Sequence, residues 1–257
     1  MNRLLAFAYG LVVYCFFLVT FLYAMGFVGN LIVPKAIDDG AAGPVVAAVL
    51  VNVALLGLFA VQHSVMARPA FKRRWTKIVP KPVERSTFVL FASAVLALLL
   101  WQWRPIGGVV WAVTDPVGVS LLYAIFAIGW GVLLAATFLI NHFELFGVAQ
   151  VWRNLRGVEP APVKFRTPGL YRWVRHPIYL GFVLAFWATP LMTVGHLLFA
   201  LATTAYILIG IWFEERDLIV EFGEQYRRYR ASVGMLLPRL ASAERTPSAP
   251  REPARGV

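Results

Sequence analysis

Long apolar runs limit what this chain can fold into more than any other feature. A helix crosses the hydrocarbon core of a bilayer with about 20 apolar residues, because each residue advances about 1.5 Å. Four runs approach or exceed that length, at residues 4–28, 45–61, 86–103 and 117–140. The composition, 60% hydrophobic and 14% charged, lies outside the range of soluble domains. The sequence therefore predicts an all-α, polytopic integral membrane protein.

A fifth apolar region, residues 178–213, is too long for one simple span. It is interrupted at residues 189–195, where Pro190 and Gly195 favour a bend. We therefore expect a tight helical hairpin with legs of about 15 to 18 residues, which would span only a thin membrane or have buried ends. The chain then has about five transmembrane regions, the last of them a hairpin.

The first apolar run is longer than the roughly 7 to 15 apolar residues of a signal peptide, and no cleavage-like site follows it. We expect this segment to be retained as a membrane helix. It contains the single cysteine, Cys15, which we expect to be a small core residue. One cysteine excludes an internal disulfide and a thiol-rich metal site.

The net charge of +11 reflects membrane topology rather than nucleic-acid binding. Of the 24 Lys and Arg residues, 22 fall in the N-terminus, the loop after the second run, residues 141–175 and the region after residue 213. By the positive-inside rule these parts and both termini are cytoplasmic, which leaves Lys35 and Arg104 on the other side. We expect a bacterial inner-membrane protein that contacts lipids and binds no nucleic acid. The oligomeric state is not indicated.

Residues 1–240 are expected to form one membrane-embedded domain, with a cytoplasmic C-terminal cofactor-binding part at about 141–240. Residues 241–257 are rich in Pro, Ala, Arg and Ser, which predicts a disordered tail.

The stretch "YRWVRHPIYLG" directly precedes the hairpin. Pro177 suits the first turn of a helix, which places Arg175 and His176 at the helix entrance. Free backbone N–H groups and the positive dipole end at such an entrance favour a carboxylate or a phosphate. A membrane anchor would need only scattered Arg and Tyr residues, so we interpret the ordered Arg-His-Pro entrance as part of a site.

Glu214 and Glu215 follow the second leg, where carboxylates are costly to bury and favour a cation. Beyond them, apolar and aromatic residues at helical spacing predict an interfacial amphipathic helix: Leu218, Phe222, Tyr226 and Tyr229. The hairpin would bring the acidic pair beside Arg175 and His176, as opposite walls of one pocket. Such a pocket suits a zwitterion, either an amino acid or the methionine part of S-adenosylmethionine.

Two further clusters carry histidines at membrane boundaries. His63 closes the second run, where capping of a helix end is a sufficient structural role. His142 and Glu144 are two residues apart and would converge only if the helix unwinds, which Gly147 permits. They could act as a general base pair or merely anchor the interface. The chain has no GxGxxG, P-loop or HExxH motif, so Rossmann, nucleotide-hydrolysing and zinc-protease chemistry lack support.

The two strings "GLYRWVRHPIYLG" and "EERDLIVEFGEQYRRYRASVGMLLPRL" resemble the C-terminal half of the isoprenylcysteine carboxyl methyltransferase and phospholipid methyltransferase superfamily. The resemblance covers roughly residues 167–240, and its motifs keep their order. It implies S-adenosylmethionine as cofactor at the cytoplasmic face. The positions that match the family's cofactor site are Arg175, His176, Pro177, Tyr179, Gly181, Glu214, Glu215, Tyr226 and Tyr229.

The strings "QHSVMARPAFKRRW", "ERSTFVL" and "NHFELFGVAQVW" resemble the methanethiol S-methyltransferase branch, which is also similar to nurim, a nuclear envelope protein. This resemblance implies methylation of methanethiol, a small volatile thiol, to dimethyl sulfide. Methyl transfer from a sulfonium is a direct displacement that needs no metal. The thiolate is the nucleophile, so a base must take the thiol proton; His142, Glu144 and His63 are the candidates. The alternatives are a methyltransferase acting on a phospholipid amine or a prenylcysteine carboxylate, and a non-catalytic membrane scaffold.

Overall fold

The computed structural model describes residues 2–41, 43–160, 162 and 164–239; the predicted tail lies outside the described residues. The helices are α1 (Arg3–Gly29), α2 (Val45–Ala67), α3 (Pro69–Trp75), α4 (Lys81–Gln102), α5 (Pro116–Ile140), α6 (His142–Leu145), α7 (Val148–Arg156), α8 (Pro177–Trp187), α9 (Val194–Phe222) and α10 (Glu224–Ser232). A 3-10 turn covers Gly169–Arg172, and the strands are β1 (Val109–Ala112) and β2 (Leu191–Thr193).

Five helices in the described part of the chain are long and apolar enough to span a membrane: α1, α2, α4, α5 and α9. The described part of the chain is 72% helical, which confirms the predicted all-α polytopic fold. The boundaries of the first four spans agree with the apolar runs to within six residues. α2 differs most, because it continues past the apolar run to Ala67. His63 therefore lies inside α2 instead of capping its end.

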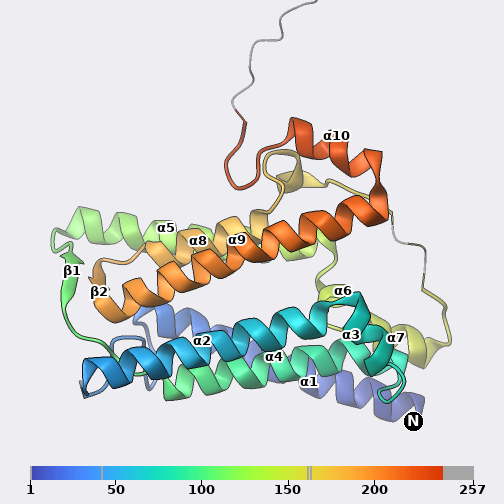
Figure 1. Cartoon of the computed structure of the whole chain (residues 1–257), viewed down its shortest axis with the longest axis horizontal. Coiled ribbons are helices and arrows are strands. Elements are labelled where there is room, and N and C mark those ends of the chain that lie inside the picture. Colours follow the sequence, from blue (N-terminus) through green and yellow to red (C-terminus); the bar gives the residue numbers. More distant parts are fainter. Residues whose placement is uncertain (1, 42, 161, 163, 240–257) are drawn as a thin grey trace, which may run out of the picture.

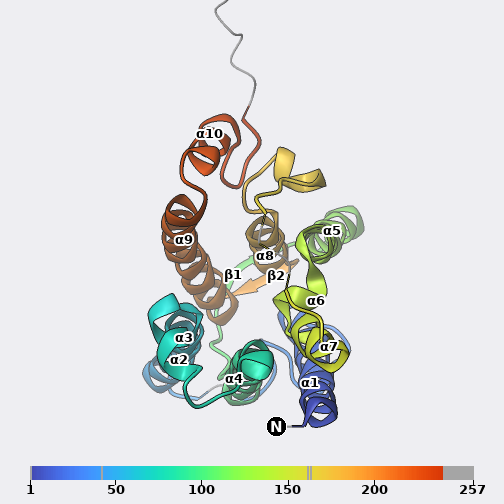
Figure 2. The ribbon, with the colours of Figure 1, turned by 90° about the vertical axis from the view of Figure 1, so that its right-hand side faces the viewer.

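The long helices form two layers, with α1, α2 and α4 in one and α5, α8 and α9 in the other (Figure 1). The end-on view shows the same arrangement, with α9 above α2 and α5 above α1 (Figure 2). The N-terminus, α3, α6, α7 and α10 gather at one end of the bundle, and the antiparallel pair β1–β2 closes the other (Figure 1). The ordered polar segments are thus concentrated at the end that carries α10.

The predicted hairpin is present, but its legs are unequal. α8 has 11 residues and α9 has 29, whereas about 15 to 18 were expected for each. The first leg ends at Trp187, shortly before Pro190, and residues 191–193 then extend as β2 and pair with β1. α8 packs closely on α5, where a Cβ on Gly181 would lie 2.5 Å from the Gly129 carbonyl oxygen. At roughly 16 Å by the helical rise, α8 is a half-span held inside the protein.

Two local expectations are wrong. Cys15 is exposed on α1 instead of packing in the core. The amphipathic helix predicted beyond Glu215 is interrupted at Gly223, whose φ of 56° lies in the left-handed region that favours glycine. The chain turns there from α9 into α10, and this turn carries Tyr226 and Tyr229 back toward the entrance of α8.

The main core lies between the two layers. Its fully buried aromatic side chains include Phe27 of α1 and Trp103 after α4, while Trp130 of α5 is 3% exposed. Trp130 makes edge contacts with Phe182 and Phe186 of α8, which fixes the half-span against α5. This packing holds the entrance of α8 in place for the polar groups described next.

Candidate active site

The entrance of α8 is anchored by the segment that follows α10. His176 is the N-cap residue and Pro177 occupies the first turn, as predicted. The backbone N–H groups of Arg175 and His176 donate to the carbonyl oxygens of Gly234 and Met235, at 2.8 and 3.1 Å. These two donors are therefore already used and do not face a ligand.

A buried ion cluster lies beside this entrance. The Glu215 carboxylate accepts from Arg175 Nε at 2.8 Å, lies 3.2 Å from His176 Nε2 and pairs with Arg230 Nε at 3.0 Å. Arg175 and Glu215 are each below 10% exposed, so neither charge could stay unpaired there without a large cost. Arg175 and Glu215 therefore bind each other directly. The expectation that they form opposite walls of a pocket is wrong.

Glu214 points the other way and remains accessible. Its side chain is 45% exposed, against 7% for Glu215. It accepts a hydrogen bond from the Tyr179 hydroxyl at 2.9 Å and lies 4.0 Å from His176 Nδ1. Of the two consecutive carboxylates, only Glu214 keeps an open face toward a ligand.

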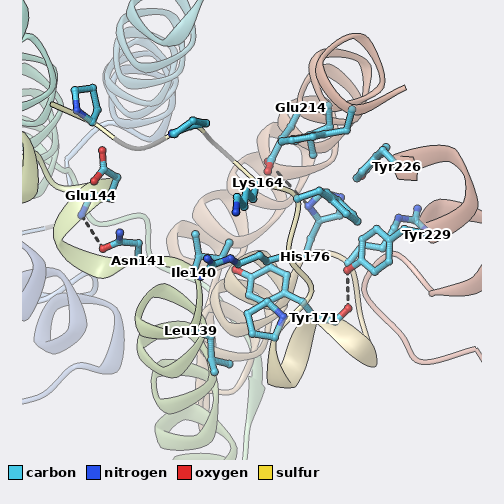
Figure 3. Close-up of a pocket in the computed structure, with 18 of the residues that line it drawn as sticks. Leu139, Ile140, Asn141, Glu144, Lys164, Tyr171, His176, Glu214, Tyr226 and Tyr229 are labelled. Atoms are coloured by element: carbon cyan, nitrogen blue, oxygen red, sulfur yellow. Dashed lines mark hydrogen bonds and ion pairs between the residues drawn. The ribbon is translucent and has the colours of Figure 1, made fainter. Parts of the chain in front are cut away.

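A cavity of about 480 Å³ opens beside Glu214. In Figure 3, Lys164, Tyr171, His176 and Glu214 surround it, and Tyr226 and Tyr229 close one side. Five of the nine residues predicted to bind the cofactor line this cavity: Arg175, His176, Glu214, Tyr226 and Tyr229. The other four support it: Pro177 starts α8, Tyr179 holds Glu214, Gly181 packs on α5, and Glu215 pairs with Arg175.

Three tyrosines line this cavity, and the Tyr171 hydroxyl donates to the Ala136 carbonyl at 3.4 Å. Burial raises the pKa of the Tyr229 phenol to about 12 and raises those of Tyr171 and Tyr226 as well. The Tyr229 hydroxyl donates to the Tyr171 carbonyl at 2.6 Å (Figure 3). The Tyr226 hydroxyl is buried and has no hydrogen-bond partner among the described residues. A buried hydroxyl without a partner is costly, which favours a polar ligand atom beside it.

Two basic residues of the cavity were treated only as topology signals in the sequence. Lys164 and Arg166 line it, are exposed and make no ion pair with a described residue. Phe165 stands between them and contacts Tyr229 edge-on, with ring centroids 5.4 Å apart. The sequence signal for these two residues is the Lys-Phe-Arg triplet, which lies shortly before the "RHP" entrance. The exposed cations of this cavity are therefore Lys164 and Arg166, whereas the guanidinium group of Arg175 is paired with Glu215.

The residues of this cavity fit S-adenosylmethionine. Glu214 suits the ammonium group, and Lys164 and Arg166 suit the carboxylate. Phe165 and the tyrosines offer aromatic faces for an adenine and a sulfonium. The cavity volume lies within the roughly 300 to 1,000 Å³ of small-molecule sites.

A second cavity, of about 250 Å³, lies on the other side of residues 141–145. Its walls come from α1, α2, α4, α5 and α8 and are mostly apolar, with phenylalanines at positions 17, 21, 59, 88, 146 and 182. The polar exceptions include His63, Arg85 and His142. We call this cavity the apolar chamber. His176 lines the polar cavity and Ile178 lines the chamber, so the first turn of α8 separates the two.

His142 has both ring nitrogens occupied. The Thr137 hydroxyl donates to the Leu134 carbonyl at 2.7 Å and is therefore the acceptor for His142 Nδ1–H at 2.9 Å. Nε2 then accepts from the Tyr14 hydroxyl at 2.8 Å. Burial lowers the pKa of the His142 imidazole below 6.5, so the ring is neutral at pH 7.

Glu144 lies apart from His142. Its two carboxylate oxygens accept from Arg153 at 2.6 and 2.7 Å, and it lines the polar cavity, not the chamber. The helix does unwind at Asn141, but the short helix α6 directs the two side chains into different cavities. The structure therefore does not bring His142 and Glu144 together as a pair.

His63 is held by aromatic rings alone. It lies 5.4 Å from the Phe59 ring and 5.0 Å from the Phe88 ring, centroid to centroid. Its Nδ1 is buried and has no hydrogen-bond partner within the described ranges. Nδ1 of His63 therefore carries no hydrogen bond to a described residue, in contrast to both nitrogens of His142.

The five apolar helices define an integral membrane protein, and the family described as phospholipid methyltransferase matches its residues 123–225. The chain is 56% identical to the methanethiol S-methyltransferase of Mycobacterium tuberculosis, over 93% of this chain and 98% of the relative. It is 57% identical to methanethiol S-methyltransferase 1 of Bradyrhizobium diazoefficiens, over 92% and 83%. The chain therefore belongs to the methanethiol S-methyltransferase family, which confirms the resemblance seen in its motifs.

Nurim of Mus musculus is a more distant relative, 31% identical over 65% of this chain and 66% of nurim. No solved structure shows a significant match to the chain.

Proposed function

We propose that the protein transfers the methyl group of S-adenosylmethionine to methanethiol and releases dimethyl sulfide. The observation that carries this proposal is the pairing of a polar cavity suited to a zwitterion with an apolar chamber suited to a small alkyl thiol. The relatives at 50–57% identity are named methanethiol S-methyltransferase, and each alignment covers at least 81% of the relative's length. These names support the same reaction.

In this proposal the polar cavity holds the cofactor. Glu214, positioned by Tyr179, receives the ammonium group, and Lys164 with Arg166 receives the carboxylate. The Tyr226 hydroxyl donates to a polar atom of the bound molecule, so that this buried hydroxyl gains a hydrogen-bond partner. When bound, S-adenosylmethionine supplies an electrophilic methyl group on a sulfonium.

The apolar chamber holds the thiol. Methanethiol is small and uncharged, so an aromatic and aliphatic enclosure binds it without a charged recognition group. The chamber walls also exclude water, which keeps the nucleophile from being solvated next to the methyl donor. Alignment of sulfur and methyl carbon is then the main task of the site.

The base is assigned to His63. Its Nδ1 makes no hydrogen bond to a described residue, whereas His142 already accepts from Tyr14 and Glu144 is neutralised by Arg153. His142 keeps the neutral tautomer set by Thr137 and forms part of the chamber wall. Catalytic roles for His142 and Glu144 stay predictions, which the alanine variants H142A and E144A test by loss of turnover with normal cofactor binding.

The end of the bundle that carries the N-terminus and α10 is proposed to face the cytoplasm of a bacterial inner membrane. The basic residues concentrated there agree with the positive-inside rule. This orientation also gives the polar cavity access to a water-soluble cofactor.

The decisive experiment is a headspace assay with purified protein, S-adenosylmethionine and methanethiol. Formation of dimethyl sulfide that H63A abolishes, with unchanged cofactor binding in calorimetric titration, is the expected result. Methylated phospholipid or prenylcysteine without dimethyl sulfide would favour the lipid-directed alternative. Absence of any heat of cofactor binding would favour a scaffold and would contradict the proposal.

A further inference from the structure

Arg85 is a cation in the wall of the apolar chamber. It lies on α4, one turn from the start of that helix, and lines the cavity together with His63 and His142. Its Nε donates to the Leu145 carbonyl at 2.6 Å, and its guanidinium carbon lies 4.7 Å from the centre of the Phe88 ring. These two contacts fix the plane of the guanidinium group but bring no negative charge to it.

The charges around Arg85 do not neutralise it. Its charged neighbours are Glu84 on the same helix, Glu144 on α6 and Lys72 on α3, and the titratable His63 faces it from α2. Arg85 makes no ion pair with a carboxylate in the part of the chain that the structure describes. Glu144 is already held by Arg153 through both oxygens.

A guanidinium group beside apolar walls, without a directly paired carboxylate among the described residues, makes a small anion favourable in the same cavity. Coulomb attraction is stronger there than in water, because the surroundings screen it less. The chamber is otherwise suited to an uncharged guest. A group that enters neutral and becomes an anion inside satisfies both properties.

We propose that Arg85 stabilises the thiolate form of the substrate in the chamber, next to His63 as the proton acceptor. This inference rests on the proposed function. The thiol S–H bond breaks, its electron pair stays on sulfur, and the proton moves to the free ring nitrogen of His63. The thiolate then uses a lone pair to form the new S–C bond, while the bond from the methyl carbon to the donor sulfonium breaks and leaves its electron pair on that sulfur. His63 finally returns the proton to water.

This role also defines the substrate class. A small thiol or selenol that enters uncharged and ionises in the chamber is favoured, whereas a permanently charged or bulky thiol is excluded by the apolar walls. The thioether product carries no negative charge, so it loses the attraction to Arg85. The positive charge of Arg85 thus favours the thiolate but does not hold the neutral product, which is therefore released.

The test compares wild type with R85M and R85Q, and uses R85K as the control that keeps the charge. At pH 7 we expect kcat/KM for methanethiol to fall about 10- to 100-fold in R85M and R85Q and less in R85K. The loss should shrink as pH rises, because the bound thiol in the wild type is then already ionised, whereas the fraction ionised in the variant still increases with pH. Calorimetric titration with S-adenosylmethionine should give the wild-type affinity in each variant, which shows that the variant is folded.

A second readout is independent of turnover. Azide, a small monoanion, should raise the thermal unfolding midpoint of wild type and R85K and should not raise that of R85M. Loss of activity by the same factor at every pH, or an azide shift that R85M retains, would overturn the role of Arg85. If the wild type forms no dimethyl sulfide, the proposed function itself fails. If the wild type is active and R85M is equally active, only the role of Arg85 fails.

Discussion

Replacement of Glu215 by glutamine separates the buried ion cluster from the ligand-facing carboxylate next to it. E215Q leaves the Arg175 guanidinium, itself below 10% exposed, without its anion, and removes the charge that faces His176 and Arg230. Breaking a buried pair costs about 3 to 5 kcal/mol. Arg175 still donates to the carbonyl oxygens of Arg230 and Val233, so we expect the lower end of this range, about 3 kcal/mol.

For a chain of this size, each kcal/mol corresponds to about 2 to 4 °C in the unfolding midpoint, so E215Q should unfold about 6 to 12 °C below wild type. The matched control is E214Q. Its side chain is 45% exposed and accepts one hydrogen bond from Tyr179, so its unfolding midpoint should change by about 4 °C or less. Its affinity for S-adenosylmethionine should fall about 10- to 100-fold, because the ammonium group loses its carboxylate.

The assay is intrinsic tryptophan fluorescence during heating of detergent-solubilised protein, combined with calorimetric titration of the cofactor. The separation of roles predicts that E215Q mainly loses stability and E214Q mainly loses affinity. An E215Q protein with a wild-type midpoint and no cofactor affinity, beside an E214Q protein with normal affinity, would refute the assignment of the two carboxylates.

Three further predictions follow from the packing and charge of the described residues. G181A should lower the free energy of unfolding by about 1 to 3 kcal/mol, because its Cβ would lie 2.5 Å from the Gly129 carbonyl oxygen, whereas G131A, which meets open space, should unfold like wild type in denaturant titrations. K164Q should weaken cofactor binding about 3- to 10-fold in calorimetry at low salt and less at high salt, and a loss that is independent of salt would exclude the charge effect. Burial lowers the pKa of His142, so its neutral form stabilises the fold above pH 6.5 and this contribution is lost as pH falls below 6.5. Between pH 6.5 and 5, the unfolding midpoint of H142Q should therefore fall less than that of the wild type. Parallel curves of midpoint against pH would contradict this prediction.

The membrane helices could be predicted because hydrophobicity and length act locally along the chain. The pairing of β2 with residues 109–112, about 80 positions earlier, could not be predicted, because it is a contact between distant segments. The break at Gly223 was also missed. A period of apolar residues continued across it, and the sequence does not reveal that this glycine adopts a positive φ.

The motifs located the polar cavity but not the partners of each charge. Arg175 and Glu215 are 40 positions apart, and their direct contact depends on how α8 and α9 pack. Lys164 and Arg166 were hidden among the many basic residues that mark topology. Arg85 was hidden for the same reason, since its place in an apolar wall depends on α2, α4 and α6 together.

The most direct test of the account is a single-turnover reaction with S-adenosylmethionine that carries a trideuterated methyl group. Dimethyl sulfide in the headspace should contain one deuterated and one ordinary methyl group, in an amount equal to the cofactor consumed. Consumption of cofactor without labelled dimethyl sulfide, or labelled methyl groups in lipid instead, would contradict methyl transfer to methanethiol.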